Sequence, residues 1–238
     1  MTTPDPAKLA AAEAAVALAE DGMRLGLGTG STAAVMVAAL AARVAREGLA
    51  LRYAATSEAT ARLAASLGLR IETLDEIGWL DMTIDGADEI DPALNLIKGG
   101  GGALLREKIV EQASDRLVVI ADTGKVVVRL GAFPLPVEVI PFGWQSTRRH
   151  IAGLLAECGL DGAAIGLRGG EAAPFRTDEG NLILDLHLGA IADAPALSGA
   201  LNRIAGVVEN GLFIGMAERA LIGAADGTVA VMTRPAAR

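Results

Sequence analysis

The sequence predicts an α/β protein of two domains, the first built on a parallel sheet and the second a smaller α+β unit. Three observations lead to this prediction. Short apolar runs alternate with helix-favouring runs from residue 6 to residue 121, as in a parallel sheet covered by helices. Two glycine loops, Gly28–Thr32 and Gly99–Gly102, each precede a helical run. A proline-marked segment, Phe133–Pro136, then changes the pattern.

The elements of the first domain follow from residue type and period. Ala-rich runs that end near glycine favour helices, and short Val/Ile/Leu runs bounded by turn residues favour buried strands. The expected helices cover residues 6–21, 33–48, 58–67 and 103–113, and the expected strands cover 23–27, 51–55, 69–73, 82–85 and 116–121.

The second domain is expected to begin after residue 131. An extended segment at 137–140 leads to a helix at 145–158, strands at 164–168 and 182–188 with a tight turn at 177–181, and a helix at 194–204. Strands at 211–216, 219–223 and 228–233 would return to the first domain. The expected division is therefore residues 1–131 plus 207–238, with 132–206 as the small α+β domain.

Composition limits the function. The chain has 238 residues, 52% hydrophobic and 21% charged, with a net charge of -8 and a pI near 4.9. Proteins that bind nucleic acids generally present a basic face, so we expect no nucleic-acid partner. The single Cys158, expected to be buried on its helix, cannot form an intramolecular disulfide, and two separate histidines make no metal cluster. With no signal peptide or membrane-spanning run, we expect a cytoplasmic protein.

The first glycine loop, Gly28-Thr-Gly-Ser-Thr32, lies between an expected strand and an expected helix. Backbone N–H groups and the helix dipole favour an anion there, and Ser31 and Thr32 add hydroxyl donors, so a phosphate is the expected ligand. The loop lacks the Lys-Ser/Thr ending of a P-loop and the third glycine of a dinucleotide fingerprint. A plain tight turn with a capping serine is the alternative.

Four carboxylates lie at and just after the end of the expected strand at 82–85: Asp85, Asp88, Glu89 and Asp91. The carboxyl ends of strands face the ligand crevice in open α/β sheets. We expect Asp85 and Asp88 to be functional, because Gly86 and Ala87 leave room for a ligand. For Glu89 and Asp91 a solvated acidic turn is the favoured interpretation.

The second glycine loop is the most informative segment: Lys98-Gly-Gly-Gly-Gly-Ala-Leu-Leu-Arg-Glu107. Its backbone can approach a small ligand closely. Glu107, in the first turns of the following helix, is a candidate general base, and Lys98 could stabilise an oxyanion. The alternative is an ordinary surface charge run, Arg106-Glu107-Lys108.

Two further lysines are candidates for ligand binding. Lys125 follows the apolar strand at 116–121 and is expected near the edge of the same crevice, as a ligand for phosphate or hydroxyl groups. Lys8 lies on the first expected helix, and its pattern fits a solvated helix residue equally well.

Together these segments, in this order, closely resemble ribose-5-phosphate isomerase of the A type. The resemblance covers nearly the whole chain. It rests on Gly26–Thr32, Thr56-Ser57, Asp85–Ile90, Lys98–Glu107, Ala121-Asp122 with Lys125, Phe133–Val139 and Gly206–Phe213.

The resemblance implies a Rossmann-like first domain, a ferredoxin-like α+β second domain, and a set of roles. Glu107 matches the base that transfers the proton, Asp85 and Asp88 match acids that handle sugar hydroxyls and ring opening, and Lys98 matches a lysine beside the enediolate oxygens. Lys8 matches a lysine that helps to hold phosphate. The implied substrate-binding residues are Lys8, Thr29, Gly30, Ser31, Thr32, Asp85, Gly86, Ala87, Asp88, Lys98, Gly99, Gly100, Gly101 and Lys125.

The implied reaction interconverts D-ribose 5-phosphate and D-ribulose 5-phosphate through a cis-enediol, in the non-oxidative pentose phosphate pathway. One carboxylate can serve both carbons, so neither metal nor redox cofactor is expected. The family resemblance also implies a homodimer or a dimer of dimers.

Two alternatives of other classes stay open at this point. A non-catalytic sugar-phosphate sensor would need a DNA-binding module, and no helix-turn-helix or basic segment precedes Gly26. Another enzyme on the same scaffold, such as a CoA transferase, a sugar-phosphate deaminase or a lactonase, would use differently placed groups. The Lys98–Glu107 segment argues against the latter.

Overall fold

The computed structural model describes residues 5–234. Its helices are α1 Pro6–Val16, α2 Ser31–Glu47, α3 Glu58–Ser66, α4 Leu74–Ile77, α5 Leu104–Gln112, the 3₁₀ turn η1 Thr123–Lys125, α6 Trp144–Glu157 and α7 Ala194–Leu201. Its strands are β1 Arg24–Leu27, β2 Arg52–Ala55, β3 Met82–Gly86, β4 Glu89–Ile90, β5 Leu96–Ile97, β6 Leu117–Asp122, β7 Leu135–Val139, β8 Ala164–Leu167, β9 Leu182–His187, β10 Val207–Asn210, β11 Leu212–Phe213, β12 Ala217–Gly223 and β13 Val229–Thr233.

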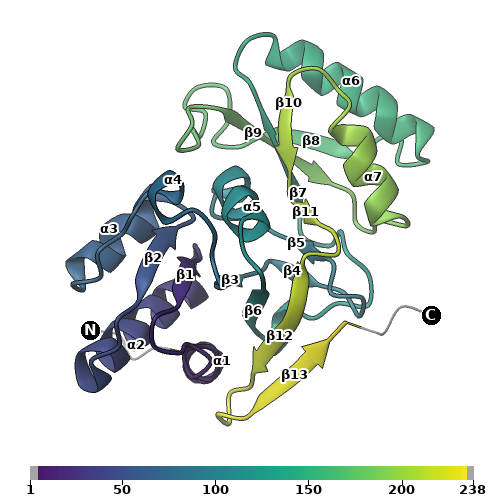
Figure 1. Cartoon of the computed structure of the whole chain (residues 1–238). Helices are drawn as coiled ribbons and strands as arrows, with labels where there is room; N and C mark the ends of the chain where they lie inside the picture. The colour runs from purple at the N-terminus through teal and green to yellow at the C-terminus, as the bar shows by residue number, and fades with distance from the viewer. Residues whose placement is uncertain (1–4, 235–238) are drawn as a thin grey trace.

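The first domain is built on a six-stranded sheet in the order β13-β12-β6-β3-β1-β2. Five of its strands are parallel, and β13 pairs antiparallel with β12 at one edge. The helices α1 and α2 pack against each other and against this sheet, where their alanines and β1 share one apolar core. Figure 1 shows β12 and β13, the last strands of the chain, completing this sheet far from β2. The expected Rossmann-like architecture is confirmed.

The order of the sheet reverses at β1. From β1 the chain passes through α2 to β2 on one side and later returns to β3 on the other side. Such a switch point opens a crevice at the carboxyl ends of the two strands. The residues at these ends are Gly28 after β1 and Asp85 with Gly86 at the end of β3.

The second domain follows the order β7-α6-β8-β9-α7-β10, and its strands form an antiparallel sheet in the order β10-β7-β9-β8. This βαββαβ arrangement is the expected ferredoxin-like unit. Its core lies between the sheet and the two helices, which Figure 1 shows on one side of the strands. The strand β10 reaches Asn210, past the expected boundary at residue 206, and the division of the chain into these residue ranges stays a prediction.

A small three-stranded sheet, β11-β5-β4, lies between the two larger sheets. Its strands have two residues each, which is too short for any period to show in the sequence. The second glycine loop leaves β5 directly and leads into α5. This sheet therefore fixes where that loop begins.

Several elements differ from the prediction. The first helix ends at Val16, not Asp21. The segment expected as a strand at 69–73 makes only one bridge, Ile71 to Tyr53, because Thr73 already caps α4 through a capping box with Glu76. Cys158 is exposed, contrary to expectation. The helix α6 ends at Glu157, and Cys158 lies just past its C-terminal end.

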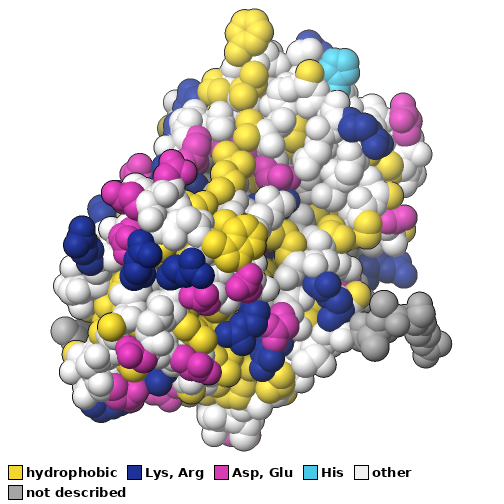
Figure 2. Space-filling view, viewed as in Figure 1, with side chains coloured by type: hydrophobic (Ala, Val, Ile, Leu, Met, Phe, Trp, Pro, Cys, Tyr) yellow, Lys and Arg dark blue, Asp and Glu magenta, His cyan; other side chains and the backbone are white. Residues whose placement is uncertain are grey.

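The surface carries charges of both signs. On the face drawn in Figure 2, Lys and Arg side chains lie among Asp and Glu side chains, and no separate basic surface is seen there. No helix within residues 5–234 is both long and apolar enough to cross a membrane.

Candidate active site

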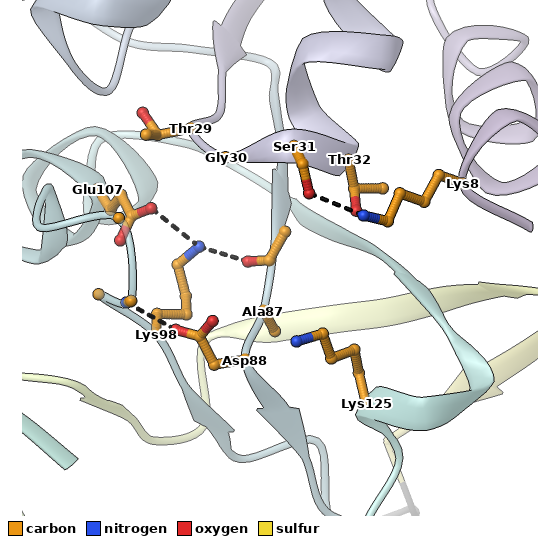
Figure 3. A pocket seen from close by; sticks show the side chains of 14 residues that line it. Lys8, Thr29, Gly30, Ser31, Thr32, Ala87, Asp88, Lys98, Glu107 and Lys125 are labelled. Atoms are coloured by element: carbon orange, nitrogen blue, oxygen red, sulfur yellow. Dashed lines mark hydrogen bonds and ion pairs between the residues drawn. The ribbon is translucent and has the colours of Figure 1, made fainter. Parts of the chain in front are cut away.

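A cavity of about 120 Å³ lies at the switch point of the first sheet. A cavity of this size, well below the roughly 300–1,000 Å³ of drug-sized pockets, suits a small polar molecule. The loop after β1, the end of β3, the second glycine loop and α5 all contribute to its wall (Figure 3). It is lined by Lys8, Thr29, Gly30, Ser31, Thr32, Gly86, Ala87, Asp88, Lys98, Gly99, Gly100, Gly101, Glu107 and Lys125. Of the residues predicted for the site, Asp85 alone is missing from this wall.

Lys98 is the centre of the buried end of the cavity. Its side chain is 2% exposed, and its ammonium donates to the carbonyl oxygen of Gly86 at 2.5 Å. Three carboxyl groups surround the same nitrogen: Asp85 Oδ2 at 3.1 Å, Glu111 Oε1 at 3.3 Å and Glu107 Oε1 at 3.6 Å. Burial by itself would lower the pKa of Lys98, but these carboxyl groups outweigh it and hold that pKa above its usual value.

Glu107 and Glu111 are both buried and lie beside the same ammonium. Burial raises the pKa of Glu107 to about 8, although Lys98 opposes the shift, and Asp85 and Asp88 add to it. Burial likewise raises the pKa of Glu111 well above its usual value. A carboxyl with a pKa near neutrality can both accept and return a proton, as a general acid–base catalyst must.

The two oxygens of Glu107 differ in their surroundings. Oε1 faces Lys98, whereas the buried Oε2 has no hydrogen-bond partner among residues 5–234. Glu107 lines the cavity, so its carboxyl group lies beside the space that a bound molecule would fill. The interpretation of residues 106–108 as a surface charge run is wrong, since Glu107 and Lys108 are both buried.

Asp85 lies behind the wall of the cavity and is fully buried. Its Oδ1 accepts hydrogen bonds from the backbone N–H groups of Thr29, at 2.9 Å, and Gly86, at 2.6 Å. A Cβ atom on Gly28 would lie 2.1 Å from this same oxygen, so the loop can approach Asp85 only with glycine there. Asp85 therefore joins β3, the first glycine loop and Lys98, and it does not face the cavity.

Asp88 does face the cavity, and its Oδ2 accepts a hydrogen bond from Gly100 N at 2.7 Å. Glu89 contradicts the expectation of a solvated turn. It is 3% exposed, and its carboxylate accepts hydrogen bonds from Gly131 N and Phe133 N, both at 2.6 Å. Both residues of β4 are buried, and the Glu89 carboxylate lies where these two buried amides need an acceptor. Asp91 holds the turn that follows, accepting from Ala93 N and Asn95 N.

The opposite end of the cavity is more open and carries cations and hydroxyl groups. The helix α2 begins at Ser31, and no side chain caps its N-terminus. Lys8 reaches this turn from α1 and donates to Ser31 Oγ at 2.9 Å. Lys125, at the end of η1, extends toward the cavity from the other side, as Figure 3 shows. This is the arrangement that a phosphate would need.

Thr29 lines the cavity, and its hydroxyl is engaged by neighbouring side chains. Its hydroxyl is hydrogen-bonded to those of Thr56, Ser57 and Thr60, at 2.7, 2.8 and 3.1 Å. Figure 3 shows this side chain directed away from Ser31 and Lys8. Because its N–H is bound to Asp85, the donors of Thr29 serve to hold the loop.

The sequence analysis missed two residues that bear on this site. Glu111 lies one helical turn after Glu107, and the spacing of four residues, which puts both on one face of α5, could have revealed it. Arg168 contacts the second glycine loop from the other domain, and no local pattern in the sequence indicates that contact. Across residues 5–234 there is no group of three or more His, Cys, Asp or Glu side chains arranged to hold a metal ion.

Comparison with known proteins agrees with this geometry. Residues 52–227 match the family model of ribose 5-phosphate isomerase A, or phosphoriboisomerase A. A protein of Jannaschia sp. named ribose-5-phosphate isomerase A is 60% identical over 227 residues, which is 95% of this chain and 87% of that protein.

Two solved structures are similar over almost their whole length. Ribose 5-phosphate isomerase A from Methanocaldococcus jannaschii has a TM-score of 0.85 at 41% identity, and the match covers 95% of this chain and 97% of that chain. A D-ribose-5-phosphate isomerase solved in complex with phospho-erythronic acid has a TM-score of 0.88 at 36% identity, and the match covers 98% of this chain and 100% of that chain. With a buried lysine–carboxylate centre at a sheet switch point and matches of this extent, the chain belongs to the ribose 5-phosphate isomerase A family.

Proposed function

We propose that this protein, as a ribose-5-phosphate isomerase, interconverts D-ribose 5-phosphate and D-ribulose 5-phosphate through a cis-enediol with Glu107 as the proton carrier. One observation carries the assignment of the base. The Glu107 carboxyl is buried at the cavity wall with a pKa raised to about 8, one oxygen facing Lys98 and the other without a partner among the described residues. Such a group can take a proton from carbon and return it at neutral pH.

The substrate would span the cavity from its open end to its buried end. Its phosphate would bind at the N-terminus of α2 with Ser31, Thr32, Lys8 and Lys125, where backbone N–H groups and cations meet. A relative was solved in complex with phospho-erythronic acid, a phosphorylated sugar acid, which supports a sugar phosphate as the ligand. C1 and C2 would then lie near Glu107.

In the direction from aldose to ketose, the open-chain sugar loses its C2 proton to the Glu107 carboxylate. The electron pair of that C–H bond forms the C1–C2 double bond, and the carbonyl oxygen on C1 becomes an oxyanion. The Lys98 ammonium, with the amides of the second glycine loop, stabilises this charge. Glu107 then delivers its proton to C1, while a proton moves from the C2 hydroxyl to the C1 oxygen.

Asp88 is the group proposed for proton exchange with the sugar oxygens, since it lines the cavity and is held by Gly100 N. Asp85 is proposed as a residue that positions Lys98 and the first glycine loop, because it lies behind the wall. The reaction oxidises one carbon of the sugar and reduces its neighbour, so its electrons balance within one molecule.

The test is an absorbance assay of ketose formation from D-ribose 5-phosphate in the presence of EDTA. We expect turnover by the wild type, and for Glu107→Gln a kcat lower by about 10²–10⁴ with KM nearly unchanged. Glu13→Gln, a change on the exposed face of α1, is the matched control. A Glu107→Gln enzyme with near-normal kcat would contradict the assignment of the base.

The same measurement tests the sensor alternative. A folded wild-type protein that binds ribose 5-phosphate without turnover would support a sensor. A cytoplasmic location is proposed, because the phosphate of the substrate keeps it from crossing membranes. A homodimer or a dimer of dimers is proposed from the family resemblance. Sedimentation of the purified protein would test the oligomeric state.

A further inference from the structure

The second domain reaches the active site through Arg168, the residue that follows β8. Its Nη1 donates to the carbonyl oxygens of Gly99, at 2.8 Å, and Gly100, at 3.2 Å. Both glycines line the cavity, whereas Arg168 does not. The guanidinium therefore holds the second glycine loop from behind.

Arg168 is itself held in place within the second domain. Asp185, on the neighbouring strand β9, accepts from Nε at 2.9 Å and from Nη2 at 2.5 Å, and both side chains are only 18% exposed. A bidentate pair of this kind fixes the plane of the guanidinium. Phe175 lies 5.9 Å from the guanidinium carbon and covers Gly102, where an added Cβ would come within 2.4 Å of the ring.

The two carbonyl bonds determine where the loop amides point. In a trans peptide the C=O of one residue and the N–H of the next point in opposite directions, and the described chain contains no cis peptide bond. With its C=O turned to Arg168, the peptide after Gly99 directs the Gly100 N–H to Asp88 Oδ2, 2.7 Å away. The peptide after Gly100 likewise directs the Gly101 N–H away from Arg168, and Gly101 lines the cavity.

We propose that Arg168, anchored by Asp185, is a positioning residue of the isomerase: it orients the glycine loop so that the Gly101 N–H donates to a sugar oxygen and the Gly100 N–H fixes Asp88. The inference rests on the proposed isomerase mechanism. The second domain thus contributes to the reaction, because without it the Gly100 carbonyl loses this partner and the Gly99 carbonyl keeps only the N–H of Gly102, at 3.0 Å. The phosphate end of the cavity is untouched by this contact.

The test compares Arg168→Ala, Arg168→Lys and Asp185→Asn with the matched control Arg176→Ala. Arg176 is an exposed arginine of the same domain, bonded only to Gly180 O among the described residues. For Arg168→Ala we expect kcat to fall about 10- to 100-fold, as for a misplaced oxyanion donor, while KM changes much less. Arg168→Lys should recover only part of the loss, because an ammonium cannot bind Asp185 and two carbonyls in one plane.

Hydrogen exchange gives an independent readout. Amides in the peptide covering residues 98–104 should exchange faster in Arg168→Ala, with no change in the α2 peptide. If Arg168→Ala fails to fold, Asp185→Asn, which keeps the arginine and loosens it, should still lower kcat. Wild-type kcat in folded Arg168→Ala or Asp185→Asn, or an equal loss in Arg176→Ala, would overturn the inference. A wild type without turnover would instead refute the proposed function.

Discussion

The two ends of the active-site cavity use charge in different ways. At the open end, Lys8, Lys125 and Ser31 lie at least partly in water at the start of α2. At the other end, Lys98 and three carboxyl groups are almost fully buried. A partly exposed cation can attract an anion from solution, whereas burial among charges shifts the pKa values of Lys98, Glu107 and Glu111. The open end is suited to binding, and the buried end is suited to proton transfer.

The largest expected effect on stability is that of removing the buried cation. Lys98→Ala should lower kcat by about 10²–10³, because a preorganised charge at the developing oxyanion is lost. It should also lower the free energy of unfolding by about 3–5 kcal/mol, as when one partner of a buried ion pair is removed. Lys125→Ala, the same change at the open end, is the control and should leave stability nearly unchanged. Urea unfolding and steady-state kinetics of both variants measure the contrast.

The stability loss in Lys98→Ala should depend on pH. Without the ammonium, Asp85, Glu107 and Glu111 lie together with no compensating charge, and they can be neutral only with protons bound. The loss should therefore be greater at alkaline than at acid pH. A loss that is the same at both would show that packing, and not charge, is what Lys98 contributes.

The next effect is the pH dependence of the wild type. The pKa of Glu107 in the folded protein, about 8, is higher than its ordinary value of 4.5. Its contribution to stability is therefore fully present below about pH 4.5 and is lost as pH rises through about 8. The pKa of Glu111 is raised as well, so Glu111 should lose its contribution to stability in the same direction. Glu107→Gln and Glu111→Gln should each remove the contribution of one glutamate to this pH dependence, so each variant gains stability relative to the wild type as pH rises. The midpoint of urea unfolding at acid and alkaline pH measures it.

The same pKa predicts the pH profile of catalysis. The base must be ionised, so kcat/KM should rise with pH through about 8 and level off above that pH. If the stability of the wild type and of Glu107→Gln changed with pH in the same way, and kcat/KM did not change with pH, Glu107 would not be the group with the raised pKa. The two variants also distinguish the roles of the two glutamates. Glu107→Gln should abolish most turnover, whereas Glu111→Gln should affect turnover less, because Glu111 has no assigned contact with the substrate.

The smallest effects are expected at the open end. Ser31→Ala and Lys125→Ala should each raise KM by about two- to tenfold, with kcat little changed. This change corresponds to the free energy of one hydrogen bond. Added salt should raise KM further in the wild type than in Lys125→Ala, since exposed charges are screened. Arg129→Ala, an exposed cation outside the cavity lining, is the control. Equal losses of kcat at both ends of the cavity would remove the distinction between binding and chemistry.

Much of the active site could be predicted from the sequence because its residues lie in short segments. Glycine-rich loops before helices, and carboxylates at the end of a strand, have local signatures that the topology of a parallel sheet brings to one edge. The roles of single oxygens could not be predicted in this way. Asp85 and Thr29 were both expected among the substrate-binding residues. Asp85 lies behind the cavity wall, whereas Thr29 lines the cavity and uses its N–H and hydroxyl to hold the loops.

The sequence by itself determined the two kinds of domain and the segments that meet at the crevice, since hydrophobic period and turn residues are local properties of the chain. Only the tertiary structure decided which charges are buried and which segments of distant sequence support them. Glu111 became part of the centre because α5 turns it toward Lys98, and Glu89 was buried because two loop amides required an acceptor. Arg168 holds the glycine loop from another domain, 69 residues from Gly99. Burial and long-range contact depend on the whole fold, and no local pattern contains them.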